Sequence, residues 1–382
     1  MKRIKVIIFA AIIFFAASCN NERDLKDKSE NRESVELKNN ESKTTFRPPD
    51  LKIELDIEAS IIGVSDGFFH YISNANGIVH VLEPSTGKEK WRFKSNSILR
   101  DEDMIVIDSR FFCKYKRFIS SFDIYGHENW RYEAKKRIDA FTASRNGTLL
   151  LTSDDLVISL SSVSGNEKWR YNANNNNFFI EVTEGVVIIE SNNIIHGIDL
   201  QSGRLKWKYE TDFIENSWKQ IASSKGVIAI ATGNTNIGDT ICLHLIDANT
   251  GQEIWKYQTE EDLIANMTIY QNYVISLCRE NLYAFDLKSG EQKLKCEVKG
   301  HYDIDEVYGN YIYLHRMVDG IESVQAVNLI TGLVQCKFQG EDLHAIKSRI
   351  TVIDGRLYFI YGSYNSKDNA IIGYDIETKS SE

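Results

Sequence analysis

The sequence lacks most of the patterns that mark a catalytic or a helical protein. No Cys-x-x-Cys occurs, so no zinc, haem-attachment or dithiol redox motif is visible among the 6 cysteines. A glycine-rich phosphate loop and a nucleophile elbow are also missing. No stretch has convincing helical periodicity, which argues against helical bundles and α/β folds.

Only one apolar run approaches membrane length, and it lies at the N-terminus. Cationic residues precede an apolar run from Val6 to Ala17, which is too short to span a bilayer as a stable helix. Small residues lead directly into Cys19, a pattern that resembles the bacterial lipobox, whose cysteine is lipidated. The sequence therefore predicts a lipoprotein signal peptide over residues 1–19 and membrane attachment through the lipid on Cys19 only. Ordinary cleavage that leaves Cys19 as a free thiol is the alternative.

The next segment, residues 20–45, is polar and contains almost no large apolar side chains. Such a segment cannot bury enough surface to fold, so we expect a flexible tether. The Pro48-Pro49 pair marks the entry into a folded domain over residues 46–382. The net charge is −9, and removal of residues 1–19, which carry 3 positive charges and no negative ones, changes it to −12. This acidity disfavours nucleic acid and anionic lipid headgroups as partners.

One motif recurs about once every 40 residues in the rest of the chain. Its form is Asp-x-x-Ser/Thr-Gly-x-x-x-Trp-Lys/Arg-Phe/Tyr, and 5 of the 6 tryptophans occupy its tryptophan position: Trp91, Trp130, Trp169, Trp207 and Trp255. The glycine position is filled by Gly87, Gly126, Gly165, Gly203, Gly251, Gly290 and Gly332. The last copy, at residues 375–378, is followed by Lys379 in place of glycine. A period of this length indicates one supersecondary unit repeated around a ring or along a solenoid.

Each unit is expected to contain four short strands. The motif is typical of a β-hairpin, because apolar residues alternate before and after a turn whose glycine supplies a positive φ. Two further alternating runs lie upstream of it, as in Ile61–Val64 and Phe68–Ile72. After the turn, Trp91 and Phe93 lie on one face of the strand, so we expect the adjacent repeat to bury these aromatic side chains. Four strands per unit predict the blade of a β-propeller, with a solenoid as the alternative.

The two ends of the chain predict how the ring closes. The eighth copy ends without a tryptophan strand, whereas Leu51, Ile53, Leu55 and Ile57 form an alternating strand ahead of the first unit. We predict that this N-terminal strand becomes the outer strand of the last blade. The fold is then an all-β, eight-bladed propeller of four-stranded antiparallel blades, with seven blades as the alternative if the last copy forms none. Leu294 and Cys336 replace tryptophan in later copies, so we expect looser packing in blades six to eight.

These motifs resemble the pyrroloquinoline-quinone-type propeller repeat, whose signature hairpin is Leu/Ile-Asp-x-x-Thr-Gly-x-x-x-Trp. Within that family, the resemblance is to lipoproteins that act in outer-membrane protein assembly. Enzymes of the family use a quinone with a calcium ion held by Glu, Asn and Asp, and often contain adjacent cysteines. This sequence has no adjacent cysteines and no long insertion for a cofactor pocket. We therefore predict no enzyme activity, no cofactor and no metal site, since a function must be argued from a site.

Histidine and cysteine offer no convincing ligand set. His80, His196 and His244 each lie 7 residues before a motif glycine, but equivalent positions on the third strands of separate blades cannot converge on one ion. Apart from Cys19 there are 5 cysteines, an odd number that leaves at least one unpaired. A Cys278–Cys296 disulfide is one alternative, and a buried free thiol at each position is the prediction.

Loops on one flat face are the expected partner-binding surface. With strands lettered A to D from the axis outward, the D–A and B–C connections share a face, and the long polar loops 233–239 and 362–369 map to it. Acidic residues collect in the D–A connections: Asp101, Glu102, Asp103, Glu260, Glu261, Asp262, Glu341 and Asp342. They predict a negatively charged ring that docks a basic protein partner, and ordinary solvated loops are the alternative.

The sequence thus favours a non-catalytic, membrane-tethered propeller that serves as a protein–protein interaction scaffold in the bacterial cell envelope. The resemblance implies a role in outer-membrane protein assembly and an outer-membrane location, either periplasmic or surface-exposed. The expected partners are other envelope proteins and, through the lipid only, a membrane. We expect a monomeric propeller that does not bind nucleic acid. A small-molecule or glycan-binding module is the first alternative, and a quinoprotein-dehydrogenase-like enzyme is the second.

Overall fold

The structure is a computed structural model that describes most of the chain between Asp50 and Ile376. The described residues are 50–55, 59–65, 68–73, 78–83, 86–94, 103–123, 125–144, 146–173, 180–191, 194–210, 218–233, 241–259, 264–278, 281–298, 301–318, 320–341, 344–353, 355–363 and 369–376. The predicted signal peptide, Cys19 and the tether lie outside these residues.

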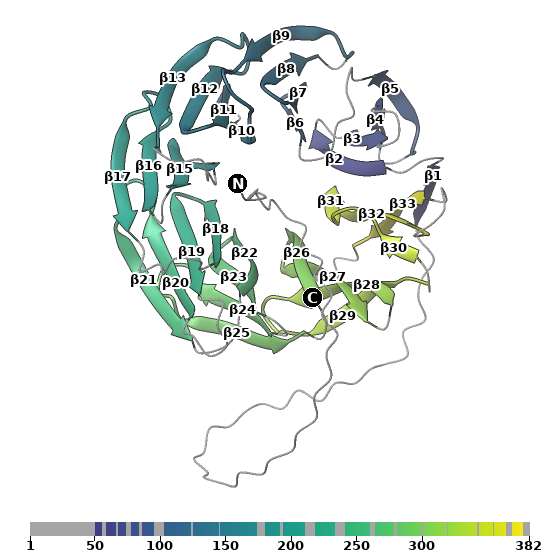
Figure 1. Ribbon diagram of the computed structural model, residues 1–382. Helices are drawn as coiled ribbons and strands as arrows, with labels where there is room; N and C mark the ends of the chain where they lie inside the picture. Colours follow the sequence, from purple (N-terminus) through teal and green to yellow (C-terminus); the bar gives the residue numbers. More distant parts are fainter. Residues whose placement is uncertain are drawn as a thin grey trace, which may run out of the picture. The chain divides into compact units, whose positions relative to one another are not determined.

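In the described part of the chain, 33 strands form 8 antiparallel sheets and no α-helix occurs. The sheets follow one another around a ring (Figure 1). Blade 1 contains β2 (Ala59–Ser65), β3 (Phe68–Ser73), β4 (Ile78–Leu82) and β5 (Glu89–Lys94), and blade 2 contains β6 (Met104–Ile107), β7 (Arg110–Tyr115), β8 (Phe118–Phe122) and β9 (Glu128–Glu133). Blade 3 contains β10 (Ala140–Ser144), β11 (Thr148–Ser153), β12 (Leu156–Ser161) and β13 (Glu167–Asn172). Blade 4 contains β14 (Ile180–Thr183), β15 (Val186–Ser191), β16 (Ile194–Asp199) and β17 (Leu205–Glu210).

Blades 5 to 7 have the same four-stranded plan. Blade 5 contains β18 (Trp218–Ser224), β19 (Val227–Gly233), β20 (Ile241–Asp247) and β21 (Glu253–Thr259). Blade 6 contains β22 (Ile264–Tyr270), β23 (Tyr273–Cys278), β24 (Asn281–Asp286) and β25 (Gln292–Glu297). Blade 7 contains β26 (His301–Tyr308), β27 (Tyr311–Val318), β28 (Ile321–Asn328) and β29 (Val334–Gln339). The strands of blades 1 to 7 therefore fit the predicted four-stranded blade. Across the described ranges, no helix has the length and apolar character needed to cross a membrane.

Blade 8 joins the two ends of the chain. It contains β30 (His344–Ile346), β31 (Thr351–Ile353), β32 (Arg356–Ser363), β33 (Asn369–Asp375) and, as its outer strand, β1 (Leu51–Leu55). Leu51 pairs with Gly373 and Leu55 with Asn369 along an antiparallel ladder. The predicted closure by the N-terminal strand is confirmed, and the seven-bladed alternative is wrong. Ile57 and the copy after Ile376 lie outside the described residues.

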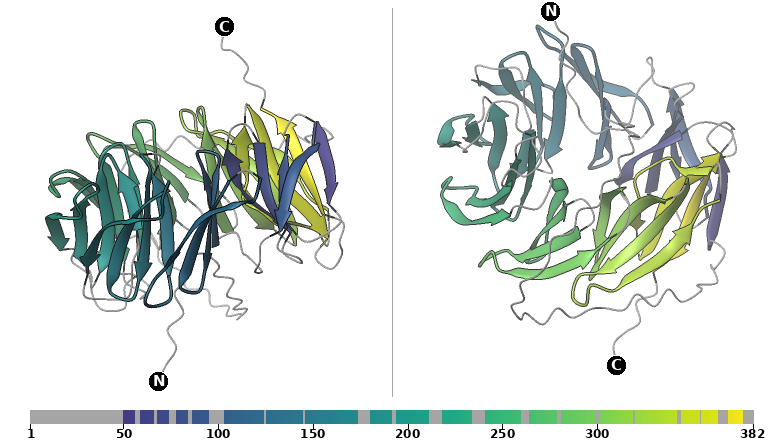
Figure 2. Two further views of the ribbon diagram at one scale, coloured as in Figure 1. Left: turned by 90° about the horizontal axis from the view of Figure 1, so that it is seen from above. Right: turned by 60° about the horizontal axis from the view of Figure 1, so that its bottom comes forward.

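Within each blade the first strand lies nearest the centre of the ring and the last lies at its perimeter (Figure 1). The strands run across the thickness of the ring, as the side view in Figure 2 shows. Because neighbouring strands are antiparallel, B–C turns and D–A connections share one face, and A–B turns and the motif turns share the other.

The hydrophobic core is divided among the junctions between neighbouring blades. Each of the 8 clusters of buried apolar residues combines side chains from two adjacent blades. Between blades 2 and 3, for example, Phe112 and Ile119 pack with Leu149, Leu151 and Leu160, all essentially inaccessible to solvent. Burial of apolar surface between blades is therefore the main force that holds the ring together.

The outer strands carry a basic residue beside the tryptophan position in blades 1 to 7: Arg92, Arg131, Arg170, Lys208, Lys256, Lys295 and Lys337. An outermost strand leaves one edge without a hydrogen-bonding neighbour in its own sheet. Charges on such a strand oppose edge-to-edge association with another molecule. The basic residues at this position thus disfavour association of the outer strands with another molecule, although the net charge of the chain is negative.

Candidate functional site

The repeated tryptophans connect each blade to the next. The indole N–H of Trp169 in blade 3 donates a hydrogen bond to the carbonyl oxygen of Leu200 in blade 4, at 2.9 Å. The same bond joins Trp130 to Ser162 (3.1 Å), Trp207 to Ala248 (2.8 Å) and Trp255 to Leu287 (3.1 Å). The polar end of a large apolar side chain is thus satisfied inside the junction.

Each of these indole rings lies on the motif glycine of the following blade. A Cβ added at Gly203 would lie 2.6 Å from the ring of Trp169, and Gly165, Gly251 and Gly290 face the preceding tryptophan in the same way. Gly203 also has a φ of +69°, which side-chain-bearing residues rarely adopt. The motif therefore needs glycine for two reasons, the turn conformation and the close approach of the indole.

Aliphatic side chains take the place of tryptophan at two other junctions. A Cβ added at Gly332 would lie 3.1 Å from Leu294, which precedes it by one blade. At the closure of the ring, Ile53 of β1 lies closer still to Gly87 of blade 1, at 2.6 Å from the added Cβ. A side-chain contact with the motif glycine is therefore present at these two junctions, which lack an indole ring.

A second, polar connection was not predicted from the sequence. The hydroxyl of Tyr209 in blade 4 donates to Glu253 of blade 5 at 2.7 Å, and Tyr132 makes the same bond to Glu167 at 3.1 Å. Tyr257 donates to Gln292 at 3.3 Å. A signal for it exists in the sequence, because glutamate stands two residues after the motif glycine in four tryptophan-containing copies: Glu89, Glu128, Glu167 and Glu253.

The three repeated histidines are buried on the third strands of blades 1, 4 and 5. His80 Nδ1 lies 2.7 Å from Glu89 and His244 Nδ1 lies 2.8 Å from Glu253, while the Tyr171 hydroxyl lies 2.9 Å from His196 Nδ1. Burial, and then the charge of Lys208, lowers the pKa of His196. These imidazoles belong to the polar connections between strands and blades. The described residues contain no cluster of three potential metal-ligating side chains.

None of the five described cysteines forms a disulfide, including Cys278 and Cys296. Burial raises the pKa of the Cys113 thiol well above its usual range and that of Cys296 to about 11. Thiols in this state are poor nucleophiles, because the thiolate is the reactive species. The alternative of a Cys278–Cys296 disulfide is therefore absent from the structure.

The predicted acidic ring is only partly within the described residues. Asp103 lies 3.2 Å from the ammonium group of Lys114, a nearly buried side chain, so it neutralises a local charge. Glu341 is exposed, and its backbone N–H donates to the hydroxyl of Tyr361. Asp103 lies in the connection before β6 and Glu341 in the connection between β29 and β30. Asp101, Glu102, Glu260, Glu261, Asp262 and Asp342 lie outside the described residues, as do most of the loops 233–239 and 362–369.

Buried carboxylates connect blade 7 to blade 8. The inner strand of blade 8 is interrupted between β30 and β31, and side chains from blade 7 accept hydrogen bonds from its backbone. Glu322 accepts from the N–H of Ile346, and Asp305 accepts from that of Ile350. His315 Nε2 lies 3.1 Å from Glu322. Burial, aided by the charge of Asp303, raises the pKa of Asp305 to about 7.

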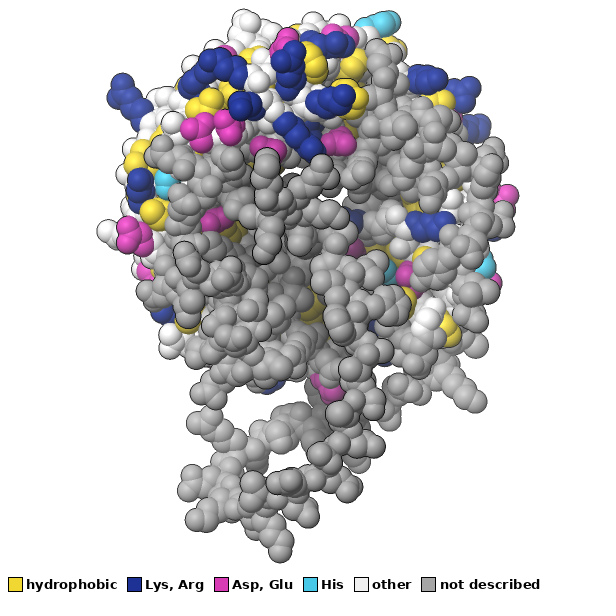
Figure 3. Space-filling view, in the orientation of Figure 1, with side chains coloured by type: hydrophobic (Ala, Val, Ile, Leu, Met, Phe, Trp, Pro, Cys, Tyr) yellow, Lys and Arg dark blue, Asp and Glu magenta, His cyan; other side chains and the backbone are white. Residues whose placement is uncertain are grey.

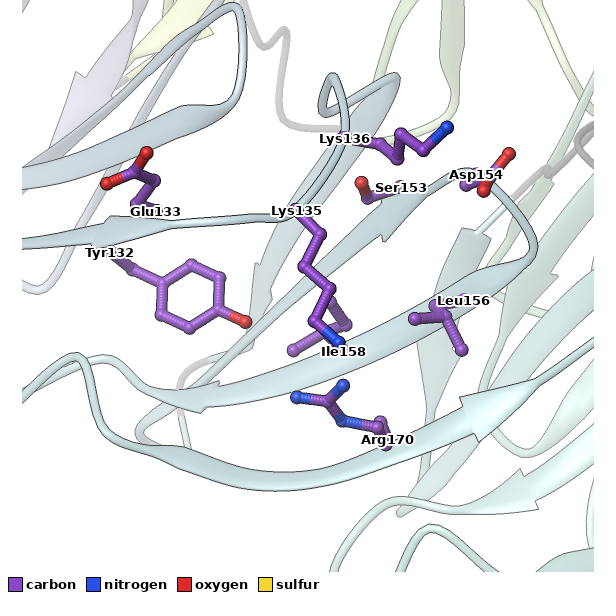
Figure 4. Close-up of a pocket in the computed structure, with 9 residues that line it drawn as sticks. All are labelled: Tyr132, Glu133, Lys135, Lys136, Ser153, Asp154, Leu156, Ile158 and Arg170. Carbon is purple, nitrogen blue, oxygen red and sulfur yellow. The ribbon is translucent and has the colours of Figure 1, made fainter.

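A basic surface that the sequence argument missed lies between blades 2 and 3. Lys and Arg side chains gather at the top of Figure 3, over the region of β8, β9 and β12. Two loops supply the exposed cations of this surface: Lys116 and Arg117, then Lys135, Lys136 and Arg137. A pocket of about 230 Å³ lies beside the second loop (Figure 4). Its lining residues are Tyr132, Glu133, Lys135, Lys136, Ser153, Asp154, Leu156, Ile158 and Arg170.

Comparisons with solved structures find the same propeller architecture. BamB from Moraxella catarrhalis aligns with a TM-score of 0.57 at 16% identity, over 87% of this chain and 99% of that one. The computationally designed Ika8 protein aligns at 0.64 with 12% identity, over 85% and 97% of the two chains. Quinohemoprotein alcohol dehydrogenase from Comamonas testosteroni aligns at 0.55 with 10% identity, over 85% and 77%. Identities this low show the fold alone.

A family model gives the more specific result. No curated protein sequence matches the chain significantly. The model described as outer membrane protein assembly factor BamB matches residues 115–338 and 239–378, which together span more than half of the chain. The matched region contains the tryptophan contacts of blades 2 to 5 and the carboxylate contacts between blades 7 and 8. The chain therefore belongs to the BamB-like family of PQQ-type β-propellers.

Proposed function

We propose that this protein is a non-catalytic scaffold, tethered by a lipid on Cys19, that binds other envelope proteins during outer-membrane protein assembly. The observation that carries the proposal is the family match over most of the propeller, because the family is named for that process. The lipobox-like run before Cys19 supports the tether, and the description of the family supports an outer-membrane location. We propose a monomeric propeller whose partners are proteins and not nucleic acids.

The use of the repeated residues supports a scaffold and not an enzyme. The tryptophans, tyrosines and motif glycines contact neighbouring blades, so the repeat stabilises the ring.

A quinoprotein-like enzyme is the second candidate, because a quinohemoprotein alcohol dehydrogenase has the same fold. Fold likeness alone does not carry an activity. The experiment for this candidate is an oxidation assay with primary alcohols, in the presence of pyrroloquinoline quinone, Ca²⁺ and an artificial electron acceptor. The scaffold proposal predicts no turnover above the protein-free control, and quinone-dependent turnover would replace it.

Capture of the full-length lipoprotein tests the scaffold. A C-terminally tagged chain is solubilised from membranes with mild detergent, purified, and its co-purifying proteins are identified and quantified. A Cys19→Ala variant, which cannot be lipidated, serves as the control for the tether. We expect stable co-purification of envelope proteins with the lipidated chain and their loss or reduction with the variant. A lipidated chain that is recovered alone contradicts the proposal.

A further inference from the structure

The chain is acidic overall, but one segment reverses this charge. Between Arg110 and Arg137 the sequence contains 8 Lys and Arg residues and 3 Asp and Glu residues, whereas the whole chain has a net charge of −9. The segment runs through blade 2 and into the connection to blade 3. A local reversal of charge on an otherwise acidic surface is a feature that a partner of negative charge can recognise.

The basic loop at residues 134–139 is held rigidly. Its two apolar residues, Ala134 and Ile138, are almost fully buried. Their backbone N–H groups donate to the carbonyl oxygens of Arg117 and Lys116, both at 2.8 Å. Lys114, buried below, donates to the carbonyl of Asp139 at 3.1 Å. Binding to this loop therefore costs little ordering entropy, because the backbone is already fixed.

The anchors leave the three consecutive cations in solvent. Lys135, Lys136 and Arg137 are exposed. The charge of Lys135 acts on Glu167 and that of Arg137 acts on Asp139, in each case favouring the ionised carboxylate. The neighbouring turn adds Lys116 and Arg117, and Arg117 pairs with Glu133. Two hydrogen-bonded loops thus present their cations on one side of the ring.

The adjoining pocket combines charge with an apolar floor. Figure 4 shows the ammonium group of Lys135 and the guanidinium group of Arg170 turned toward one another across it. Ile158 is almost fully buried, and Leu156 and the ring of Tyr132 supply further apolar surface. Glu167 accepts from Arg170 at 2.7 and 2.6 Å and from the hydroxyl of Tyr132. Two more carboxylates, Glu133 and Asp154, line the pocket.

We propose that this basic surface and its pocket bind an acidic segment of a partner protein. A carboxylate of the partner lies between Lys135 and Arg170, and a neighbouring aliphatic side chain packs on Leu156 and Ile158. Further partner carboxylates pair with the cations of the exposed loop. The pocket has room for one or two amino-acid side chains, which fits a protein anchor point. This proposal rests on the scaffold function proposed above and specifies that the partner of the scaffold has an acidic segment.

A membrane surface is the less suitable partner. An anionic bilayer repels a chain of net charge −9, and Glu133 and Asp154 at the pocket interrupt the cationic surface that a sheet of phosphates needs. A bilayer also offers no single side chain that enters a concave pocket. The proposed partner differs from the basic protein that the acidic loops predicted.

Titration with defined probes tests the inference on the detergent-solubilised full chain. The probe is a fluorescein-labelled peptide of alternating Glu-Leu and Asp-Leu pairs, followed by anisotropy at several salt concentrations. The test variant is Lys135→Glu/Lys136→Glu/Arg137→Glu. Its matched control, Lys206→Glu/Lys208→Glu/Lys256→Glu, makes the same change of charge on the outer strands of blades 4 and 5. We expect saturable binding that the test variant weakens by about tenfold or more and the control by less than about twofold.

Other results would overturn the proposal. Equal loss in both variants shows a general charge effect, and no binding by the wild-type chain removes the site. Tighter binding to vesicles containing phosphatidylglycerol, or competition by inorganic phosphate, assigns the surface to phosphate groups. Partner capture separates this test from that of the scaffold. If the wild-type chain and the test variant capture the same envelope proteins equally well, the scaffold proposal stands and the inference fails.

Discussion

The junctions between consecutive blades from 2 to 6 and the junction between blades 7 and 8 use different kinds of side chain. In the first group, an indole lies on a glycine and donates to a backbone carbonyl. In the second, carboxylates of Asp305 and Glu322 accept from the backbone of an interrupted inner strand. Each junction therefore contains a connection between neighbouring blades, although the residues that make the connection differ.

The two kinds of junction respond differently to conditions. Apolar contacts depend on buried area and are insensitive to pH. A buried carboxyl group stabilises the fold when its hydrogen bonds are satisfied. Its contribution depends on pH, because burial disfavours the ionised form. We therefore expect the closing blade to be sensitive to pH and the apolar contacts, such as those of β11 in blade 3, to change little with pH.

Removal of the closing strand has the largest expected effect. A chain that begins after residue 45 keeps β1, whereas a chain that begins after residue 58 loses it and leaves β33 as an unpaired edge. We expect the shorter chain to aggregate and the longer one to remain folded and soluble, because exposed edges promote association. Size-exclusion chromatography and circular dichroism compare the two. Equal solubility and equal unfolding midpoints would contradict the closure.

Replacement of Trp169 by alanine tests the apolar junction. The side chain is 9% exposed and fills the contact between blades 3 and 4. Loss of a buried aromatic side chain should lower the free energy of unfolding by about 3–5 kcal/mol. Leu294→Ala removes a smaller side chain at the equivalent position and should cost about 2–4 kcal/mol. Denaturant unfolding measures both, and equal small losses at the two positions would show that the contact with the glycine is unimportant.

Replacement of Asp305 by asparagine tests the carboxylate junction. The pKa of Asp305 is about 7 in the folded chain and about 4 in an unfolded one, so stability is lost as pH rises from about 4 to about 7. The pKa of His315 is raised by Glu322 and Asp305 despite burial, so its contribution is also lost as pH rises. Asparagine keeps the bond from Ile350 and cannot ionise. We expect the variant to exceed the wild type by about 2–4 kcal/mol at pH 8 and to differ little at pH 4.

Thermal or denaturant unfolding across this pH range measures the difference. A matched control is Asp286→Asn, at an exposed turn carboxylate in blade 6 that accepts from Ser289. Its pKa is lowered, so its contribution is lost as pH falls, the opposite direction. If both variants show the same pH dependence, the assignment to Asp305 is wrong.

Replacement of Tyr209 by phenylalanine has the smallest expected effect. The change removes only the hydroxyl that donates to Glu253 and lies 3.1 Å from His244 Nδ1. We expect a loss of about 1–2 kcal/mol in the free energy of unfolding, since the acceptor is a charged group. Tyr125→Phe, at an exposed turn position, provides a control that should have almost no effect.

The sequence predicted the ring because its information is periodic. Alternation, turn glycines and five tryptophans at one spacing were sufficient for blade number, strand order and closure by Leu51–Leu55. The tyrosine–glutamate bonds were missed because they join residues about 35 to 44 positions apart in neighbouring blades. The carboxylates of blade 7 were missed because they break the pattern, and a departure from a repeat has no template.

The candidate surface shows the same limit. The prediction of a partner-binding surface named acidic residues in D–A connections. It did not include Lys135, Lys136 and Arg137, which lie in a connection of the same class. Their significance depends on the anchoring of Ala134 and Ile138 and on the approach of Arg170, which only the fold provides. Partner identity depends in addition on a second molecule, and no pattern within one chain contains it.

Native-state hydrogen exchange is the most direct test of the contrast between the two kinds of junction. Exchange of backbone amides is followed at pH 5.5 and pH 8 and corrected for the intrinsic effect of pH on exchange. We expect protection of residues 344–353 in blade 8 to fall at the higher pH, while protection of residues 148–153 in blade 3, which carry no ionisable side chain, stays unchanged. In the Asp305→Asn chain the fall in blade 8 should be much smaller. An equal response of both blades to pH, or a fall that asparagine does not reduce, would contradict the account.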